Sequence, residues 1–218
     1  MAVYAMVPAR KGSERLKLKN LLNINGRPVV SYGIDIAKQA QSFDRIILNS
    51  DIPELEAVAI NEGVDFYLRD NQIANSDTSS DEVVYDFFNQ FEEADIVVWI
   101  NAISPLQDPD EIKRALAYFE SEGLDSLISS CLFSRHALFQ GKPINFDKKS
   151  KFAKTQNLEP IEIFSYSFMI WRRSAFITAF ENSGSAMFCG KFSTFLVDFK
   201  SMLAIKEQED FDLIRKLM

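Results

Sequence analysis

Short apolar runs alternate with amphipathic stretches along most of the chain, and this alternation constrains the fold more than any other feature. Four apolar runs are typical of buried strands: Val3–Val7, Arg45–Leu48, Ile96–Ile100 and Ser126–Ser130. Helical spacing of apolar residues begins after Pro28, after Pro53, near Ser80 and after Asp108-Pro109. Alternating strands and helices favour a doubly wound, mostly parallel α/β sheet with helices on both faces. In such sheets ligands bind beyond the carboxyl ends of the strands, so we look for chemistry in the loops there.

The rhythm of the sequence breaks after about Phe133. Residues 140–157 are polar and Lys-rich, which is typical of a long loop or a protruding arm. The pattern then resumes with a strand, a helix, a strand and a terminal helix: Ile161–Trp171, Arg173–Phe180, Phe195–Phe199 and Glu207–Leu217. We predict a single domain over 1–218, with an arm or small subdomain at about 134–165.

Composition excludes several classes of protein. The chain has 218 residues, 47% of them hydrophobic, and a formal net charge of -7, an acidic balance that argues against broad nucleic-acid binding. Two cysteines, Cys131 and Cys189, are too few for a disulfide framework and are expected to be buried. No apolar run predicts a membrane span, and Met1 leads directly into the first strand without a basic leader. We therefore expect a cytoplasmic protein that binds neither nucleic acid nor membrane.

The segment after the first strand is strongly basic. Five cations fall within ten residues: Arg10, Lys11, Arg15, Lys17 and Lys19. In an acidic chain this cluster indicates an anion site, where Gly12 would let the backbone approach a phosphate closely. The alternative is a solvated basic loop. The segment has neither the Walker P-loop pattern nor the three spaced glycines of a dinucleotide fingerprint, so it needs another phosphate-binding architecture.

The order of residues in this basic segment is specific, and further stretches match the same family in chain order. The pattern is Ala9-Arg10-x-Gly12-Ser13-x-Arg15-x-x-x-Lys19-Asn20, then Gly26-x-Pro28, Asn49-Ser50-Asp51, Gly63, Arg69, Ser104-Pro105-Leu106, Gln156-Asn157-Leu158-Glu159-Pro160 and Glu209-Asp210-Phe211. It resembles the acylneuraminate cytidylyltransferases, which make CMP-activated sialic, pseudaminic or legionaminic acids, and more distantly the CMP-Kdo synthetases. The resemblance covers essentially the whole chain.

This resemblance implies a fold and a reaction. The implied fold is a three-layer α/β sandwich with a mixed, mostly parallel sheet of the nucleotidyltransferase (nucleotide-diphospho-sugar transferase) type, whose arm crosses to a partner in a homodimer. The implied reaction is attack by a hydroxyl of a sugar acid on the α-phosphate of CTP with release of pyrophosphate, for surface polysaccharide such as lipopolysaccharide. That step depends on positioning and on stabilisation of developing negative charge.

The resemblance also implies roles for individual residues. The catalytic cations are Arg10, Arg15 and Lys19. The implied nucleotide-binding residues are Ala9, Arg10, Gly12, Ser13, Arg15, Lys19, Asn20, Arg69, Asn101 and Ser104. Gly12 and Ser13 would bind the triphosphate and Asn20 would organise the loop, although local loop hydrogen bonding is the alternative for Asn20 and Ser104. The implied substrate-binding residues for the sugar acid are Arg135, Gln156 and Tyr166; a plain loop pair with His136 is the alternative for Arg135.

The chain departs from the family pattern where the magnesium ligands are expected. The family carries Asp-Ile-Asp ahead of the closing Glu-Asp-Phe, and this chain has Ala204-Ile205-Lys206. Ala and Lys cannot supply the hard oxygen ligands that Mg²⁺ prefers. Asp198, Glu207 and Asp51 are the alternative donors, each with a simpler interpretation as a capping or surface carboxylate, and Lys206 could instead replace part of the charge of the metal.

Two further departures lie in the expected pocket, and three hypotheses follow. Asn101-Ala102-Ile103 stands where the family has Gln-Pro-Thr, and residues 164–171 lack the family's Gly. The leading hypothesis is an active cytidylyltransferase that uses CTP and a sialic-acid-like sugar acid. The alternatives are a catalytically inactive nucleotide-binding homologue that acts as a partner or regulatory subunit, and a nucleotidyltransferase for another base or sugar. Restoring Asp at 204 and 206 would raise activity only if the chain is inactive.

Overall fold

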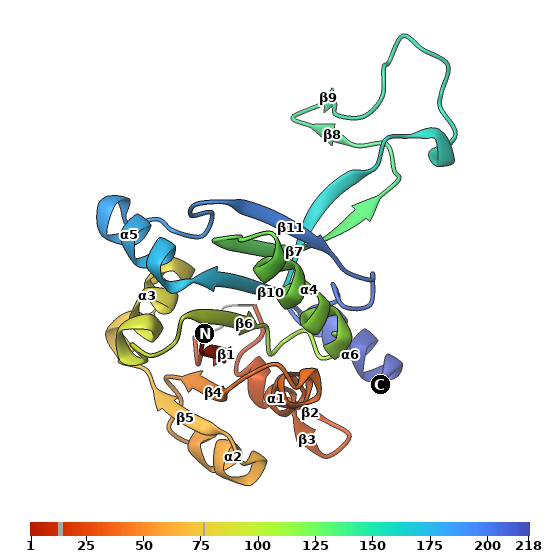
Figure 1. The fold of residues 1–218 in the computed structure, drawn as a ribbon. Coiled ribbons are helices and arrows are strands. Elements are labelled where there is room, and N and C mark those ends of the chain that lie inside the picture. The colour runs from red at the N-terminus through yellow and green to blue at the C-terminus, as the bar shows by residue number, and fades with distance from the viewer. Residues whose placement is uncertain (13–14, 76) are drawn as a thin grey trace.

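One seven-stranded sheet organises the chain, with the strand order β11-β7-β10-β6-β1-β4-β5 (Figure 1). The computed structural model describes residues 1–12, 15–75 and 77–218. The strands are β1 (Val3–Ala9), β4 (Arg45–Ser50), β5 (Asp65–Leu68), β6 (Ile96–Ile100), β7 (Ser126–Phe133), β10 (Ile161–Arg172) and β11 (Phe192–Leu196). Only β10 runs against its neighbours, β6 and β7, while the other pairings are parallel. The predicted mostly parallel sheet is confirmed.

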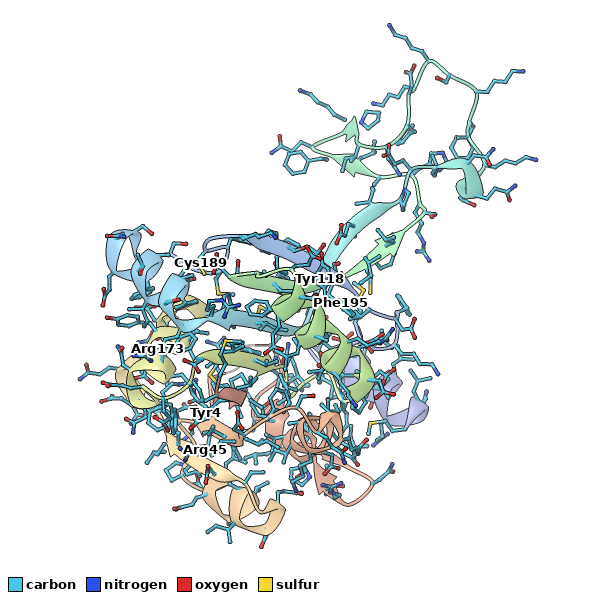
Figure 2. All side chains as sticks on the ribbon, viewed as in Figure 1. Tyr4, Arg45, Tyr118, Arg173, Cys189 and Phe195 are labelled. Carbon is cyan, nitrogen blue, oxygen red and sulfur yellow. The ribbon has the colours of Figure 1, made fainter. Side chains whose placement is uncertain are left out.

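Helices cover both faces of the sheet and make three layers. One face carries α1 (Val29–Ala40), α2 (Leu55–Glu62) and α4 (Pro109–Ser121), and the other carries α3 (Ser80–Gln90) and α5 (Arg173–Ser183). The last helix, α6 (Gln208–Leu217), packs in a smaller cluster with Ile24 and Val29. Figure 2 shows Tyr118 of α4 beside Phe195 of β11, with ring centroids 6.2 Å apart. The predicted three-layer α/β class is confirmed.

Local signals set the helix ends where the sequence predicts them. Helix α4 begins after Asp108, whose carboxylate accepts the N–H of Asp110 at 2.9 Å, and Pro109 takes its first turn. Helix α2 ends at Gly63, which adopts a left-handed φ of 65° that costs glycine little. These caps fix the loops on either side of the strands.

Two elements differ from the sequence expectation. The edge strand β5 was not predicted, because its residues are exposed or half-buried and do not form an apolar run. Strand β11 covers Phe192–Leu196 instead of the predicted Phe195–Phe199, because pairing with β7 starts at Phe192↔Ser126 and the chain leaves the sheet after Leu196. Both are edge strands, where burial supplies the weakest signal.

Short elements shape the loops between the main strands. A hairpin joins β2 (Asn23–Ile24) to β3 (Arg27–Pro28) through Asn25 and Gly26, which both have positive φ as a type I′ turn requires. Short 3-10 helices cover Lys19–Leu21, Asn71–Ile73 and Thr155–Asn157. The first of these holds Lys19 and Asn20 of the basic segment.

Residues 134–160 project away from the sheet as an arm (Figure 1). The arm leaves from the end of β7, turns through β8 (Leu138–Phe139) and β9 (Lys142–Pro143), and returns into β10. Its side chains stand clear of the body in Figure 2, and Phe152 is 83% exposed. Its part in dimerisation remains a prediction.

The remaining predictions from the sequence concern membrane-spanning segments and the two cysteine thiols. Across residues 1–12, 15–75 and 77–218, no helix is both long enough and apolar enough to cross a bilayer. Cys131 and Cys189 are buried free thiols, as predicted, and burial raises the pKa of the Cys189 thiol to about 11.

Candidate functional site

A cavity of about 330 Å³ opens beyond the carboxyl ends of β1 and β6. The chain leaves β1 for β4 and β5 on one side and returns through α3 to β6 on the other side, so the cavity lies where the strand order reverses. This switch point is the usual ligand site of open α/β sheets, and the volume is in the range of small-molecule pockets. The lining residues are Pro8, Arg10, Lys19, Asn20, Arg69, Thr78, Ser79, Ser80, Val83, Trp99, Asn101 and Ile103.

Arg69 is the most deeply buried cation of the cavity, with 4% of its surface exposed. Its backbone N–H donates to the carbonyl of Ser50 at 2.8 Å, which fixes the chain as it leaves β5. Its Nη2 lies 3.9 Å from Oδ1 of Asp51, whereas its Nε is buried without a hydrogen-bond partner among the described residues. Burial lowers the pKa of the Arg69 guanidinium. A buried donor with spare capacity suits an anionic ligand.

Asn20 and Asp51 hold the start of the basic segment. The Asn20 side chain is buried, and its Nδ2 donates to the carbonyl of Arg10 at 3.4 Å. The backbone N–H of Lys11 donates to Oδ1 of Asp51 at 3.0 Å. The Arg10 side chain reaches the carbonyl of Asn75 through Nη1 at 3.4 Å. These contacts tie the segment to the end of β1, to the turn after β4 and to the loop before α3.

Lys19 is half-buried in the cavity wall, and its pKa is lowered to about 8. Burial is the main cause, and the positive charges of Arg15, Arg10 and Lys206 add to it, against an opposing effect of Asp210. Lys19 is therefore mostly charged at pH 7 in surroundings that penalise the charge. A polyanion bound there would relieve that penalty.

Other residues of the basic segment lie beside the cavity. Ala9 ends β1 directly before Arg10, and Gly12 is exposed in the following loop. Arg15 is exposed and its Nη1 lies 3.7 Å from Oε1 of Glu207. Ser13, which the sequence assigns to the triphosphate, lies outside the described residues.

The turn after β6 shapes the opposite wall. The Nδ2 of Asn101 donates to the carbonyl of Tyr166 at 3.1 Å, so this turn is tied to β10. Ser104 is fully buried and is not among the residues that line the cavity as described. The carbonyl of Ser104 accepts from Nε2 of Gln107 at 2.9 Å, whereas its buried Oγ has no hydrogen-bond partner among the described residues.

Of the three residues assigned to the sugar acid, only Tyr166 lies near the cavity, because its backbone carbonyl accepts from Asn101, which lines it. Tyr166 lies at a bulge of β10 with a left-handed φ of 56° and with 46% of its surface exposed. Arg135 and Gln156 are exposed on the arm. Neither is among the described residues that line the cavity.

The sequence analysis missed part of the cavity. Thr78, Ser79 and Ser80 bring the N-terminus of α3 to the cavity, where its backbone N–H groups favour negative charge. Ser79 forms a capping box with Glu82, and this Ser-x-x-Glu pattern was readable in the sequence as a helix start. Trp99 of β6 also lines the cavity, and its buried Nε1 has no partner within the described ranges.

The residues present do not fit a protein-held magnesium ion. Within the described parts of the chain, no three His, Cys, Asp or Glu side chains gather as a metal group would require. Glu207 pairs with Arg15 and caps α6, and Asp51 accepts the N–H of Lys11 and faces Arg69. Asp198 is exposed after β11. Glu207 and Asp51 thus have other partners, and Asp198 is exposed. No step of the chemistry is therefore assigned to a metal.

Comparisons with known proteins show the family of the chain. A family model described as cytidylyltransferase matches residues 4–173. An N-acylneuraminate cytidylyltransferase of Streptococcus agalactiae is 27% identical over 169 residues, which cover 74% of this chain and 41% of that protein. A pseudaminic acid cytidylyltransferase of Campylobacter jejuni is 33% identical over 124 residues, covering 55% of this chain and 53% of that protein. The matched part of this chain thus spans about half or less of the length of these relatives.

Solved structures support the same fold. A CMP:2-keto-3-deoxy-manno-octonic acid synthetase in complex with CTP superposes with a TM-score of 0.76 at 16% identity and covers 100% of this chain and 98% of its own. A 4-diphosphocytidyl-2C-methyl-D-erythritol synthase of Anaerococcus prevotii gives a TM-score of 0.67 at 10% identity, with 99% and 97% covered. At these identities the likeness concerns the fold alone.

Proposed function

Because the chain belongs to the cytidylyltransferase family whose model matches residues 4–173, we propose that it transfers the cytidylyl group of CTP to a hydroxyl of a sugar acid. Relatives named for acylneuraminate and pseudaminic acid support a sialic-acid-like acceptor. The observation that carries the proposal is one cavity, beyond β1 and β6, that holds the buried Arg69 and the half-buried Lys19.

The cations would bind the triphosphate, and the N-terminus of α3 would add backbone donors. In the proposed reaction the acceptor hydroxyl forms a new bond to the α-phosphorus and loses its proton to the solvent, while the bond from the α-phosphorus to the bridging oxygen breaks and pyrophosphate leaves with its electron pair. Negative charge develops on the leaving pyrophosphate. Arg10 and Lys19 line the cavity and Arg15 lies close enough to act on Lys19, so the basic segment would face the pyrophosphate. Cations placed at this point stabilise such charge, and of these three only Lys19 is half-buried while Arg10 and Arg15 are exposed.

The acceptor side would be completed by a second copy of the chain. Six of the chain's 24 Lys and Arg lie in residues 134–160, but only two of its 31 Asp and Glu do, so the arm is basic and the body acidic. The arm also exposes Phe139, Ile144 and Phe152, a large apolar surface for a segment without a core of its own. A homodimer in which each arm lies against the partner would cover this surface and carry Arg135 and Gln156 towards a cavity.

The proposed setting follows from the proposed reaction. CTP and a sugar acid made inside the cell would place the reaction in the cytoplasm, and a CMP-activated sugar acid would serve surface polysaccharide such as lipopolysaccharide. Neither nucleic acid nor membrane has a part in this reaction.

Pyrophosphate release tests the proposal. The purified protein is incubated with each of the four nucleoside triphosphates, with Mg²⁺, Mn²⁺ or EDTA, and with a panel of sugar acids. We expect release that requires CTP and one sugar acid, that falls at least tenfold in Arg10→Ala, and that is unchanged in Lys113→Ala, which removes an exposed cation of α4. Binding of CTP without release in any mixture would instead favour the inactive homologue, and absence of both would refute the proposal.

A further inference from the structure

The segment before α6 lies next to a residue that lines the cavity. Ile205 is fully buried with Ile24 and Val29, and its backbone N–H donates to the carbonyl of Ile103 at 2.8 Å. Ile103 lines the cavity. The chain is thus fixed at the cavity edge immediately before Lys206.

Positive charge converges at this edge. The residue after Lys206 is Glu207, whose carboxylate lies 3.7 Å from Nη1 of Arg15. Lys206 is also one of the three cations, with Arg15 and Arg10, that lower the pKa of the cavity residue Lys19. Two separate parts of the chain, the basic segment after β1 and the segment before α6, therefore bring cations to one end of the cavity.

The carboxylates beside these cations already have partners among the described residues, and Glu207 pairs with Arg15 itself. Oδ2 of Asp210 accepts the backbone N–H groups of Lys206 and Glu207, each at 2.9 Å, and so caps α6. Oδ1 of Asp51 accepts the N–H of Lys11 and faces the guanidinium of Arg69. The chain offers hydrogen-bond donors and positive charge at the place where a bound divalent cation would need hard oxygen ligands.

We propose that Lys206 binds the triphosphate directly, together with Arg10, Arg15 and Lys19, so that the protein takes up free CTP without holding a metal ion. The inference rests on the proposed function, because it specifies how the same cavity binds its nucleotide. Charge-assisted hydrogen bonds from fixed cations neutralise a triphosphate as a bound metal ion otherwise does. Lys206 is suited to this because its backbone is pinned on both sides, by Ile205 and by the cap of α6.

Calorimetric titration with CTP tests the metal independence. We expect the dissociation constant in EDTA to lie within about threefold of the value in excess Mg²⁺, because the protein supplies the countercharge. Affinity at least tenfold weaker in EDTA would overturn the inference while leaving the proposed function intact. No binding of CTP under either condition would remove the proposed function itself, so the two failures are distinguishable.

A variant assigns the effect to Lys206. Lys206→Ala should weaken CTP binding in EDTA by about tenfold, a typical loss for one charge-assisted contact, and leave CMP binding unchanged because CMP lacks the β- and γ-phosphates. Lys206→Arg should retain most of the affinity. The matched control is Lys216→Ala, which removes an exposed cation from the far end of α6. Equal affinity of Lys206→Ala and Lys216→Ala for CTP, with equal melting temperatures, would refute the role of Lys206.

Discussion

The cavity and the arm are both rich in basic residues, but they hold these residues in opposite ways. In the cavity, Arg69 is buried beside Asp51 and Lys19 is half-buried with a lowered pKa. On the arm, Lys149, Lys151 and Lys154 are exposed to solvent. A cation that is already desolvated and oriented gains most from an anionic ligand, whereas a lysine exposed on a projecting arm, away from any ring of other cations, exchanges water for ligand at little gain. The difference assigns small-ligand binding to the cavity and surface contact to the arm.

The largest expected effect comes from removing the buried cation. Arg69→Met should lower CTP-dependent pyrophosphate release by about 100-fold, because it removes a buried donor and the positive charge that faces Asp51. Lys151→Ala on the arm should leave CTP affinity unchanged. Steady-state rates and thermal melting of both variants measure this. A larger loss of CTP affinity in the arm variant than in Arg69→Met would reverse the assignment of the two regions.

Shortening the arm tests its role as an interface. Replacing residues 140–157 by a short Gly-Ser linker should convert a dimer to a monomer in sedimentation experiments and lower pyrophosphate release by roughly tenfold or more, since Gln156 would be removed and Arg135 would lose its position. Affinity for CTP per chain should persist. A wild-type protein that sediments as a monomer at micromolar concentration would contradict the proposed homodimer.

The pKa of Lys19 predicts how CTP binding depends on pH. With its pKa lowered to about 8, Lys19 loses its proton as the pH rises from 7 to 9, so CTP affinity should fall by about tenfold over this range. Arg15, Arg10 and Lys206 lower this pKa and Asp210 raises it. Lys19→Arg should flatten the profile because arginine stays charged. Titrations at several pH values measure both profiles, and equal slopes would show that another group titrates.

The lowered pKa of Lys19 also affects the free energy of unfolding. A lysine whose pKa is lower in the folded state binds fewer protons there than in the unfolded state, so its contribution to the free energy of unfolding rises with pH between about 8 and 10.5. Lys19→Met should therefore raise the melting temperature of the nucleotide-free protein at pH 7 while weakening CTP binding. A lower melting temperature in that variant would show that Lys19 stabilises the loop.

The smallest expected effect concerns Tyr166, on the strand that joins the arm to the cavity rim. Its left-handed φ of 56° costs a non-glycine residue roughly 1 kcal/mol. Tyr166→Gly should therefore be more stable than Tyr166→Ala by about that amount, the reverse of the usual order. Urea unfolding of the two variants measures it. Greater stability of Tyr166→Ala would show that the backbone relaxes without cost.

The sequence predicts the scaffold and the cations of the cavity better than it predicts the rest of the site. Apolar runs locate β1 and β6, and Asp108-Pro109 locates the start of α4, because these signals are local. Strand β5 escapes prediction because an edge strand is only half-buried. The α3 residues Ser79 and Ser80 reach the cavity only because α3 crosses one face of the sheet, which is a property of the topology and not of neighbouring residues.

The residues assigned to the pocket by resemblance also divide into those placed by a local signal and those placed by the fold. Lys19 and Asn20 line the cavity because the basic segment follows directly from β1. Ser104 is buried because the turn after β6 folds back on Gln107. The sequence shows that Ala204 and Lys206 replace carboxylates, but only the fold places Lys206 beside residues that line the cavity.

Binding of CTP to the wild-type protein and to Arg69→Met, followed by calorimetry, tests the central claim most directly. The claim is that the cavity beyond β1 and β6 binds the nucleotide through buried and preorganised cations. It predicts one CTP bound per wild-type chain and affinity weaker by at least 30-fold in a folded Arg69→Met variant, as expected for loss of a buried charged contact. Equal affinity in the two proteins, or no binding of CTP by the wild-type protein, would contradict it.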